Sequence, residues 1–157
     1  MSGMENYLRF RIGKYEFYVP IRYVGRVYPA AALSDYPVGD HPSLAGFIVI
    51  EGEPLAVVTI HERLGISFRG IEIENKMILM EWNGFRFLLI VDEVMDVPEL
   101  DPAAFKDLAV NTHTKGRLLI DAAGRYILDD PGSLIREDIL IDLTTGERIS
   151  SENLDAE

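Results

Sequence analysis

The residues best suited to acid–base or metal chemistry are three histidines and one run of carboxylates. The histidines, His41, His61 and His113, are scattered, and none has a second histidine at ligand spacing. The zinc-protease pattern HExxH is absent, and the lack of cysteine excludes thiolate catalysis, disulfides and cysteine-bound zinc. The histidine pattern therefore predicts no metal site.

The carboxylate run covers residues 92–99 and contains enough oxygen ligands to suggest calcium binding or paired-acid catalysis. It lacks the sharp-turn glycine and the closing bidentate glutamate of an EF-hand loop. Val94 and Val97 lie within it, so a solvated acidic face beside a buried apolar stripe is the favoured interpretation.

Patterns for nucleophilic or nucleotide chemistry are also missing. The sequence contains no GxSxG, no GxxxxGK[ST] and no GxGxxG. Trp82, Phe85 and Phe87 would suit an aromatic ligand platform, but strand alternation favours ordinary core positions, with some of these rings facing outward. We therefore predict that the protein is not an enzyme and that it has no catalytic residues and no cofactor.

The net charge and the length of the chain limit which functional classes remain. The chain of 157 residues carries 26 acidic and 15 basic residues, a formal charge of −11, which opposes binding to nucleic acid or to an anionic membrane. No leading signal-type run and no apolar stretch of the roughly 20 residues that span a bilayer is visible. We predict a cytoplasmic protein that binds no nucleic acid, does not insert into membranes and forms one compact unit over residues 1–157.

Paired apolar runs joined by tight turns dominate the chain. Leu8, Phe10 and Ile12 alternate onto one strand face, and Asn83-Gly84 suits the type I′ turn of a β-hairpin. A further short strand is predicted at 94–97. The hairpins are predicted at 7–12 with 15–19, 46–51 with 55–60, 77–82 with 85–91, and 117–120 with 125–129.

Helical patterns are few and short. Pro20 can begin a helix, and Ile21, Val24 and Val27 follow at three-residue spacing. Further single turns are predicted at 61–64, 101–104 and 130–134. Short strands, tight turns and little helix favour an all-β fold of small barrels.

These hairpins, in order and spacing, resemble the CheW family, the coupling proteins of bacterial chemotaxis-type signalling. The segment Val91-Asp92-Glu93-Val94-Met95-Asp96-Val97 is similar to the family pattern V-D-x-V-x-x-V and carries the most weight. The other similar segments are residues 7–13 with 15–19, 21–27, 44–52 with 57–60 and 64–65, and 124–129 with 134–135.

The resemblance implies a fold and a role. It implies two packed five-stranded SH3-like barrels with a few short helices, placed at about 15–66 and 76–137. Strand 7–12 would be shared or pack on the second barrel, and 138–157 would be a C-terminal extension. It also implies an adaptor that couples the regulatory domain of a CheA-type histidine kinase to the cytoplasmic tip of chemoreceptors.

The sequence departs from the family at surface positions. The family pattern Asn-Leu-Arg-Gly is Val49-Ile50-Glu51-Gly52 here, Arg26 stands where glutamate is common, and Thr59 replaces a usual aspartate. We hypothesise that Arg26 and Glu51 form a charge-inverted pair. The departures point to a specialised pathway.

Val24 and Gly46 match positions linked to receptor contact in the family. Each also has a structural explanation, since Val24 suits a core position and Gly46 suits a bend at a strand start. Val49 either extends an exposed apolar patch or is buried. The candidate protein-binding residues are Val24, Arg26, Gly46, Val49 and Glu51. An alternative function is a small SH3-like ligand-binding or regulatory module that is not linked to a kinase.

Overall fold

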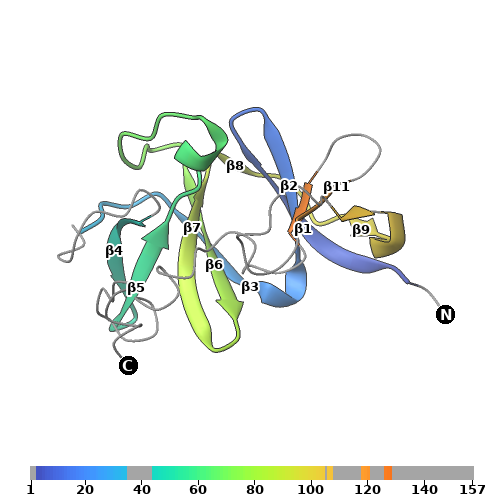
Figure 1. The fold of residues 1–157 in the computed structure, drawn as a ribbon. Coiled ribbons are helices and arrows are strands. Elements are labelled where there is room, and N and C mark those ends of the chain that lie inside the picture. Colours follow the sequence, from blue (N-terminus) through green and yellow to red (C-terminus); the bar gives the residue numbers. More distant parts are fainter. Residues whose placement is uncertain (1–2, 35–43, 105, 108–117, 121–125, 129–157) are drawn as a thin grey trace, which may run out of the picture.

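The computed structural model describes residues 3–34, 44–104, 106–107, 118–120 and 126–128. In these residues the chain forms two β-sheets that pack side by side (Figure 1). The first sheet has the order β10-β11-β12-β2-β1-β8, with β9 also pairing with β1. Its strands are β1 (Glu5–Ile12), β2 (Tyr15–Pro20), β8 (Glu93–Val94), β9 (Glu99–Leu100), β10 (Lys106–Asp107), β11 (Leu118–Ile120) and β12 (Tyr126–Leu128).

The second sheet has five strands in the order β3-β6-β7-β5-β4. They are β3 (Val24–Pro29), β4 (Leu44–Ile50), β5 (Glu53–Val58), β6 (Lys76–Trp82) and β7 (Phe85–Val91). The helical elements of the described residues are single 3-10 turns, η1 (Ile21–Tyr23), η2 (Glu62–Leu64) and η3 (Pro102–Ala104). The predicted fold class, all-β with two small packed SH3-like barrels and a few short helices, is confirmed.

The predicted barrel boundaries at 15–66 and 76–137 are corrected by the strand pairing. β2 pairs with β1 and β12 in the first sheet, whereas β6 pairs with β3, and β7 pairs with β5, in the second. The second sheet is therefore built from 24–58 together with 76–91. Hairpin patterns specify local pairs, but the parallel pairing of β5 with β7 and the crossing between sheets are long-range contacts that leave no local pattern.

The predicted helix at 20–27 is also corrected. Only Ile21–Tyr23 is helical, and Val24 begins strand β3. Gly25 disfavours a helix, the β-branched Val24 and Val27 favour extended backbone, and pairing with β6 completes the strand. The turns at 61–64 and 101–104 are confirmed as η2 and η3. The predicted turn at 130–134 and the extension 138–157 lie outside the described residues.

The main core lies between the two sheets. The predicted face of β1 is buried there, with Phe10 and Ile12 fully inaccessible. They pack in one cluster with Met80 and Phe87 of the second sheet, both also inaccessible. A second cluster, which includes Leu88, fills the other face of the five-stranded sheet.

Phe87→Ala should remove a fully buried ring from the core between the sheets. We expect the free energy of unfolding to fall by about 3–5 kcal/mol because the cavity forms where both sheets meet. Urea denaturation measures the change. The control Ile73→Ala, at a side chain that is 85% exposed, should shift it by less than about 0.5 kcal/mol. Equal losses in both variants would contradict this core assignment.

Candidate functional site

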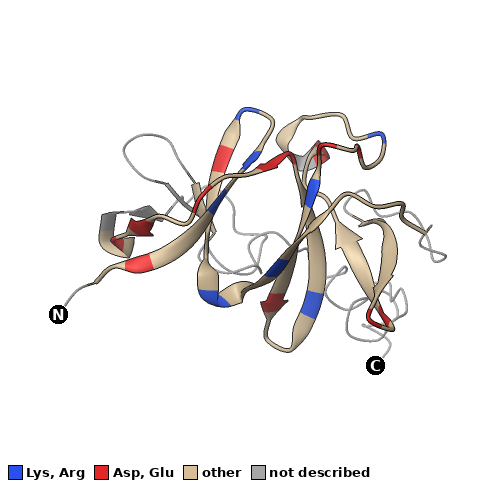
Figure 2. Cartoon of the chain, turned by 180° about the vertical axis from the view of Figure 1, so that it is seen from behind, with Lys and Arg blue, Asp and Glu red and all other residues tan. Residues whose placement is uncertain are grey.

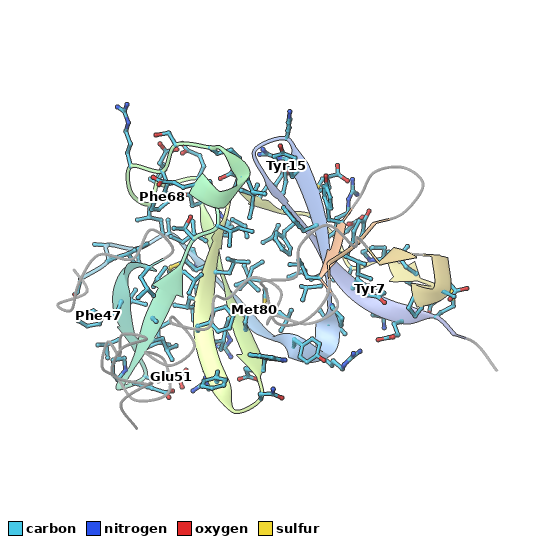
Figure 3. All side chains as sticks on the ribbon, viewed as in Figure 1. Tyr7, Tyr15, Phe47, Glu51, Phe68 and Met80 are labelled. Carbon is cyan, nitrogen blue, oxygen red and sulfur yellow. The ribbon has the colours of Figure 1, made fainter. Side chains whose placement is uncertain are left out.

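Only part of one face of the five-stranded sheet is covered by the first sheet. On β6 and β7 this face carries Met80 and Phe87, which are buried in the core between the sheets. On β4 and β5 it carries Phe47 and Ala56, which face each other in register and are only half-buried. Figure 3 shows Met80 between the sheets, and Phe47 at the β4 edge of the second sheet, away from the first sheet. Among the described residues, the first sheet therefore leaves this face uncovered over β4 and β5, and we call this part of the sheet the open face.

Strand register places four apolar side chains in a line across the end of this face. Trp82 pairs with Phe85, and their rings stack with centroids 6.0 Å apart. The parallel register of β5 with β7, continued toward the starts of both strands, brings Pro54 beside Phe85. Pro54 in turn pairs with Val49, which is 58% exposed. We call these four residues the apolar row.

Charged residues lie at the same end of the sheet, on the face opposite the apolar row. Arg86 forms ion pairs with Glu53 and with Glu81, the latter at 3.3 Å between Nε and Oε2. Glu51 occupies the β4–β5 turn, and in the described residues its carboxylate has no hydrogen bond or ion pair. Acidic residues gather at this turn (Figure 2). This end of the sheet thus carries the apolar row on one face, with Val49 exposed and Trp82 and Phe85 half-buried, and an excess of negative charge at the turn and on the other face.

Of the five predicted binding residues, only two lie at the apolar row. Val49 and Glu51 lie at the apolar row, at the end of β4 and in the turn that follows. Val24 is half-buried, pairs with Met80 and packs against the core between the sheets. Arg26 is exposed on β3, with its guanidinium 6.0 Å from the centre of the Tyr28 ring.

The predicted pair between Arg26 and Glu51 is not formed. β3 and β4 stand at opposite ends of the sheet order, and no ion pair joins these two side chains within the described part of the chain. The hypothesis treated the two strands as neighbours because their family counterparts invert together, but β6, β7 and β5 lie between them in the order.

Gly46 has a structural role that is plain in the geometry. Its φ of +149° lies in a region that side chains rarely adopt, and a Cβ there would sit 2.4 Å from the carbonyl oxygen of Ser34. The register of β4 and β5 also shifts between Leu44 and Gly46. This glycine therefore permits the close bridge between Ser34 and Phe47.

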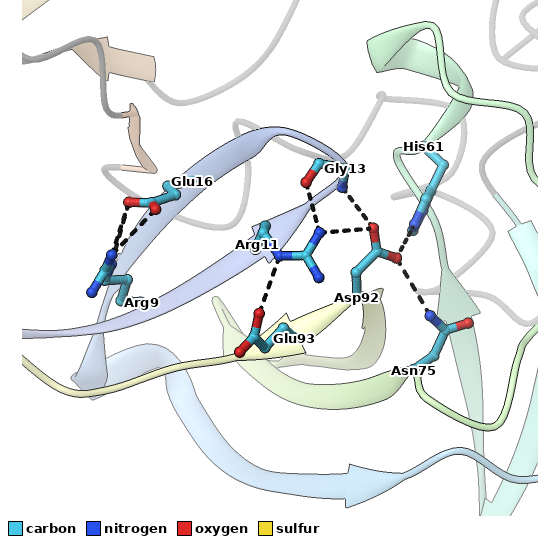
Figure 4. Close-up of polar contacts among 8 residues, drawn as sticks. All are labelled: Arg9, Arg11, Gly13, Glu16, His61, Asn75, Asp92 and Glu93. Carbon is cyan, nitrogen blue, oxygen red and sulfur yellow. Dashed lines mark hydrogen bonds and ion pairs between the residues drawn. The ribbon is translucent and has the colours of Figure 1, made fainter.

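A polar junction between the sheets was not foreseen from the sequence. Asp92 lies between β7 of the second sheet and β8 of the first. Its Oδ2 accepts the backbone N–H of Gly13 at 2.6 Å, and its Oδ1 lies 2.9 Å from Nε2 of His61 and 3.4 Å from Nδ2 of Asn75 (Figure 4). Arg11 approaches Oδ2 at 3.9 Å.

The junction continues to a buried hydroxyl. Oγ1 of Thr59 lies 2.8 Å from Nδ1 of His61 and also accepts the His61 backbone N–H at 3.2 Å. The hydroxyl, imidazole and carboxylate are thus arranged in the same order as in a Ser-His-Asp catalytic triad. Thr59 is only 2% exposed and its oxygen is already used by the backbone, so a substrate has no path to it. The arrangement serves to hold the sheets together.

Above the junction lies an open cleft of about 320 Å³ with charged residues of both signs, among them Arg69 and Glu72. Its buried polar side chains, His61 and Asn75, are both hydrogen-bonded to protein groups. No cluster of metal-ligating side chains occurs among the described residues, and no helix found in them is long and apolar enough to cross a membrane.

Comparison with known proteins decides the family. The model of the CheW-like domain matches residues 6–134. The chain belongs to the CheW-like family. Among solved structures, the scaffolding protein TtCheW from Thermoanaerobacter tengcongensis superposes with a TM-score of 0.67 at 21% identity, over 80% of this chain and 88% of that one. No curated protein matches.

Members of the CheW-like family are scaffolds rather than enzymes, which fits a junction whose hydroxyl is sealed from solvent. The aspartate of the pattern V-D-x-V-x-x-V is Asp92, the residue whose carboxylate joins the two sheets. Within this CheW-like domain, sequence reasoning found Val49 and Glu51 but assigned Trp82 and Phe85 to the core. Cross-strand pairing about the Asn83-Gly84 turn is the sequence feature that places these two rings together.

Asp92→Asn should weaken the junction in a pH-dependent way. Burial opposes ionisation of Asp92, but hydrogen bonds from His61 and the Gly13 N–H, with the charge of Arg11, hold its pKa below the ordinary value. A lowered pKa in the folded state means that ionised Asp92 stabilises the fold at neutral pH, and that this stabilisation is lost as pH falls through the folded pKa.

We expect the variant to lose about 1–2 kcal/mol of unfolding free energy at pH 7, the lower range for a charged hydrogen-bond acceptor because a quarter of the side chain is exposed. The gap from the natural chain should narrow progressively as pH falls below about 4. Urea denaturation across pH 3–7 measures it. Asp96→Asn, at a largely exposed side chain, is the matched control. A gap that stays constant with pH would refute this role for Asp92.

Proposed function

We propose that this chain is a non-catalytic cytoplasmic adaptor that couples a CheA-type histidine kinase to chemoreceptors. Its partners would be the regulatory domain of the kinase and the cytoplasmic tip of the receptor. Membership of a scaffold family and the TtCheW-like fold support this role. The charge of −11 favours protein partners over nucleic acid and anionic membranes.

The observation that carries the proposal is the open face with its apolar row. Contiguous exposed apolar groups on a rigid sheet are typical of surfaces that are covered by a partner. Val49 is 58% exposed at one end of the row, Pro54 beside it is also exposed, and the half-buried, stacked rings of Trp82 and Phe85 form the other end. We assign this face to the receptor tip, with Val49 and Glu51 in direct contact.

The other predicted residues would act with this face in different ways. Arg26 is exposed on β3 and is available for contact with a partner. Val24 and Gly46 would support the surface from within, since Val24 packs on the core and Gly46 fixes the bend of β4. A second contact, with the kinase, would add avidity, because two modest interfaces strengthen each other when both partners share one assembly.

The unusual charge at Glu51 and the apolar Val49 point to a specialised pathway. They also favour the second candidate, a small SH3-like regulatory module that binds a different protein without a kinase. Binding to both array partners supports the adaptor, and binding to neither supports the alternative.

Val49→Ser tests the assigned face. We expect the natural chain to bind a purified receptor-tip fragment from the same organism, and the variant to bind about tenfold more weakly because one apolar side chain is lost from the contact. Calorimetry or biolayer interferometry measures both affinities. Ile73→Ser, at an 85% exposed site away from the apolar row, should bind as the natural chain does. Unchanged affinity of the Val49 variant would rule out this face, and absence of any binding would rule out the adaptor.

A further inference from the structure

Glu51 occupies a backbone position that suits its side chain poorly. Its φ is +53°, and the next residue, Gly52, has φ +81°. Together they form the two-residue turn between β4 and β5, closed by the pair Ile50 and Glu53. Positive φ at both central residues is the mark of a type I′ turn, whose first position prefers asparagine, aspartate or glycine.

The same sheet contains a second hairpin with the same turn geometry and the preferred residue. Asn83 has φ +51° and Gly84 has φ +81°, between β6 and β7. Both turns lie at the same end of the sheet, because β5 and β7 run parallel from these turns. The chain therefore places asparagine at one turn and accepts a disfavoured glutamate at the equivalent position of the other.

Nothing within the described residues compensates Glu51 for this strain. Its carboxylate is exposed and makes no hydrogen bond or ion pair there. The nearby Arg86 is already shared by Glu53 and Glu81. Strained backbone positions cluster at binding and catalytic sites. The strain at this exposed side chain therefore motivates a functional hypothesis for Glu51.

We infer that Glu51 is retained for its charge, and that it pairs with a lysine or arginine of the receptor tip at the edge of the apolar row. This inference rests on the proposed function, since it names the chemistry of the partner at that face. An apolar contact bordered by a complementary charge fixes the register of docking and rejects partners that carry an acidic residue there. The adaptor would thus select a receptor tip with a basic residue beside its apolar contact.

Three substitutions separate strain from charge. Glu51→Asn removes the charge and relieves the turn, so its melting temperature should rise by about 2–4 °C while receptor-tip affinity falls. Glu51→Gln removes the charge but keeps the strain, so affinity should fall by about fivefold with little change in melting temperature. Glu51→Lys should bind most weakly of all.

The matched control is Glu74→Gln, which makes the same change in net charge at an exposed residue before β6, at the opposite end of that strand from Trp82. It should bind the receptor-tip fragment as the natural chain does. Raising the salt concentration should weaken binding of the natural chain more than that of Glu51→Gln.

The outcomes distinguish the two levels of the proposal. If the natural chain binds the tip and Glu51→Gln binds equally well, the charge pairing is overturned while the adaptor role stands. If Glu51→Lys binds more tightly, the partner is acidic and the inference is again overturned. If Glu51→Asn melts no higher than the natural chain, the premise of a strained turn fails. If no form binds the tip, the proposed function falls and takes the inference with it.

Discussion

The carboxylate of Asp92 is the constraint that the arrangement of the two sheets depends on. It stands where the chain leaves β7 for β8, so its position is fixed by both sheets at once. From there it accepts the Gly13 N–H in the turn of the first sheet and contacts His61 beside the second. Apolar packing between the sheets is strong but allows sliding, since hydrophobic contact has little direction. Charge-assisted hydrogen bonds set on both sides of the crossing define one orientation.

The hairpins and the buried strand faces could be predicted because they leave local patterns. The alternation at Phe10 and Ile12 and the Asn83-Gly84 turn needed only near neighbours in the sequence. The barrel boundaries failed because the partner of β7 is decided by contacts with β5, far away in the chain. The short segment from Val24 was misassigned as helix because the register of β3 shifts between Val24 and Val27, and such a bulge produces three-residue spacing within a strand.

Prediction of the candidate site followed the same division. Val49 and Glu51 stood out because they depart from a family pattern. Trp82 and Phe85 look like core residues in one dimension, and only the sheet order reveals that the first sheet stops short of them. The run 92–99 was interpreted as a solvated acidic face, yet Asp92 within it is the junction. The sequence alone does not distinguish a carboxylate that joins two sheets from one on a surface loop. Only the partners distinguish them, and those of Asp92, such as His61 and Gly13, are distant in the chain.

Thr59 and Glu51 are polar residues under different physical constraints, one in the interior of the fold and one on its surface. Thr59 places a hydroxyl in the junction. Because a hydroxyl both donates and accepts, it can serve Nδ1 and the backbone N–H of His61 together, without a second negative charge near Asp92. The hydroxyl is therefore part of a network in which the Nδ1 and backbone N–H of His61 are both hydrogen-bonded. Glu51, by contrast, lies on an exposed turn where no side chain among the described residues pairs with its carboxylate. In this chain a substitution at Thr59 must satisfy the junction, whereas one at Glu51 disturbs no side-chain contact of the described residues, so stability and the proposed partner contact depend on different positions.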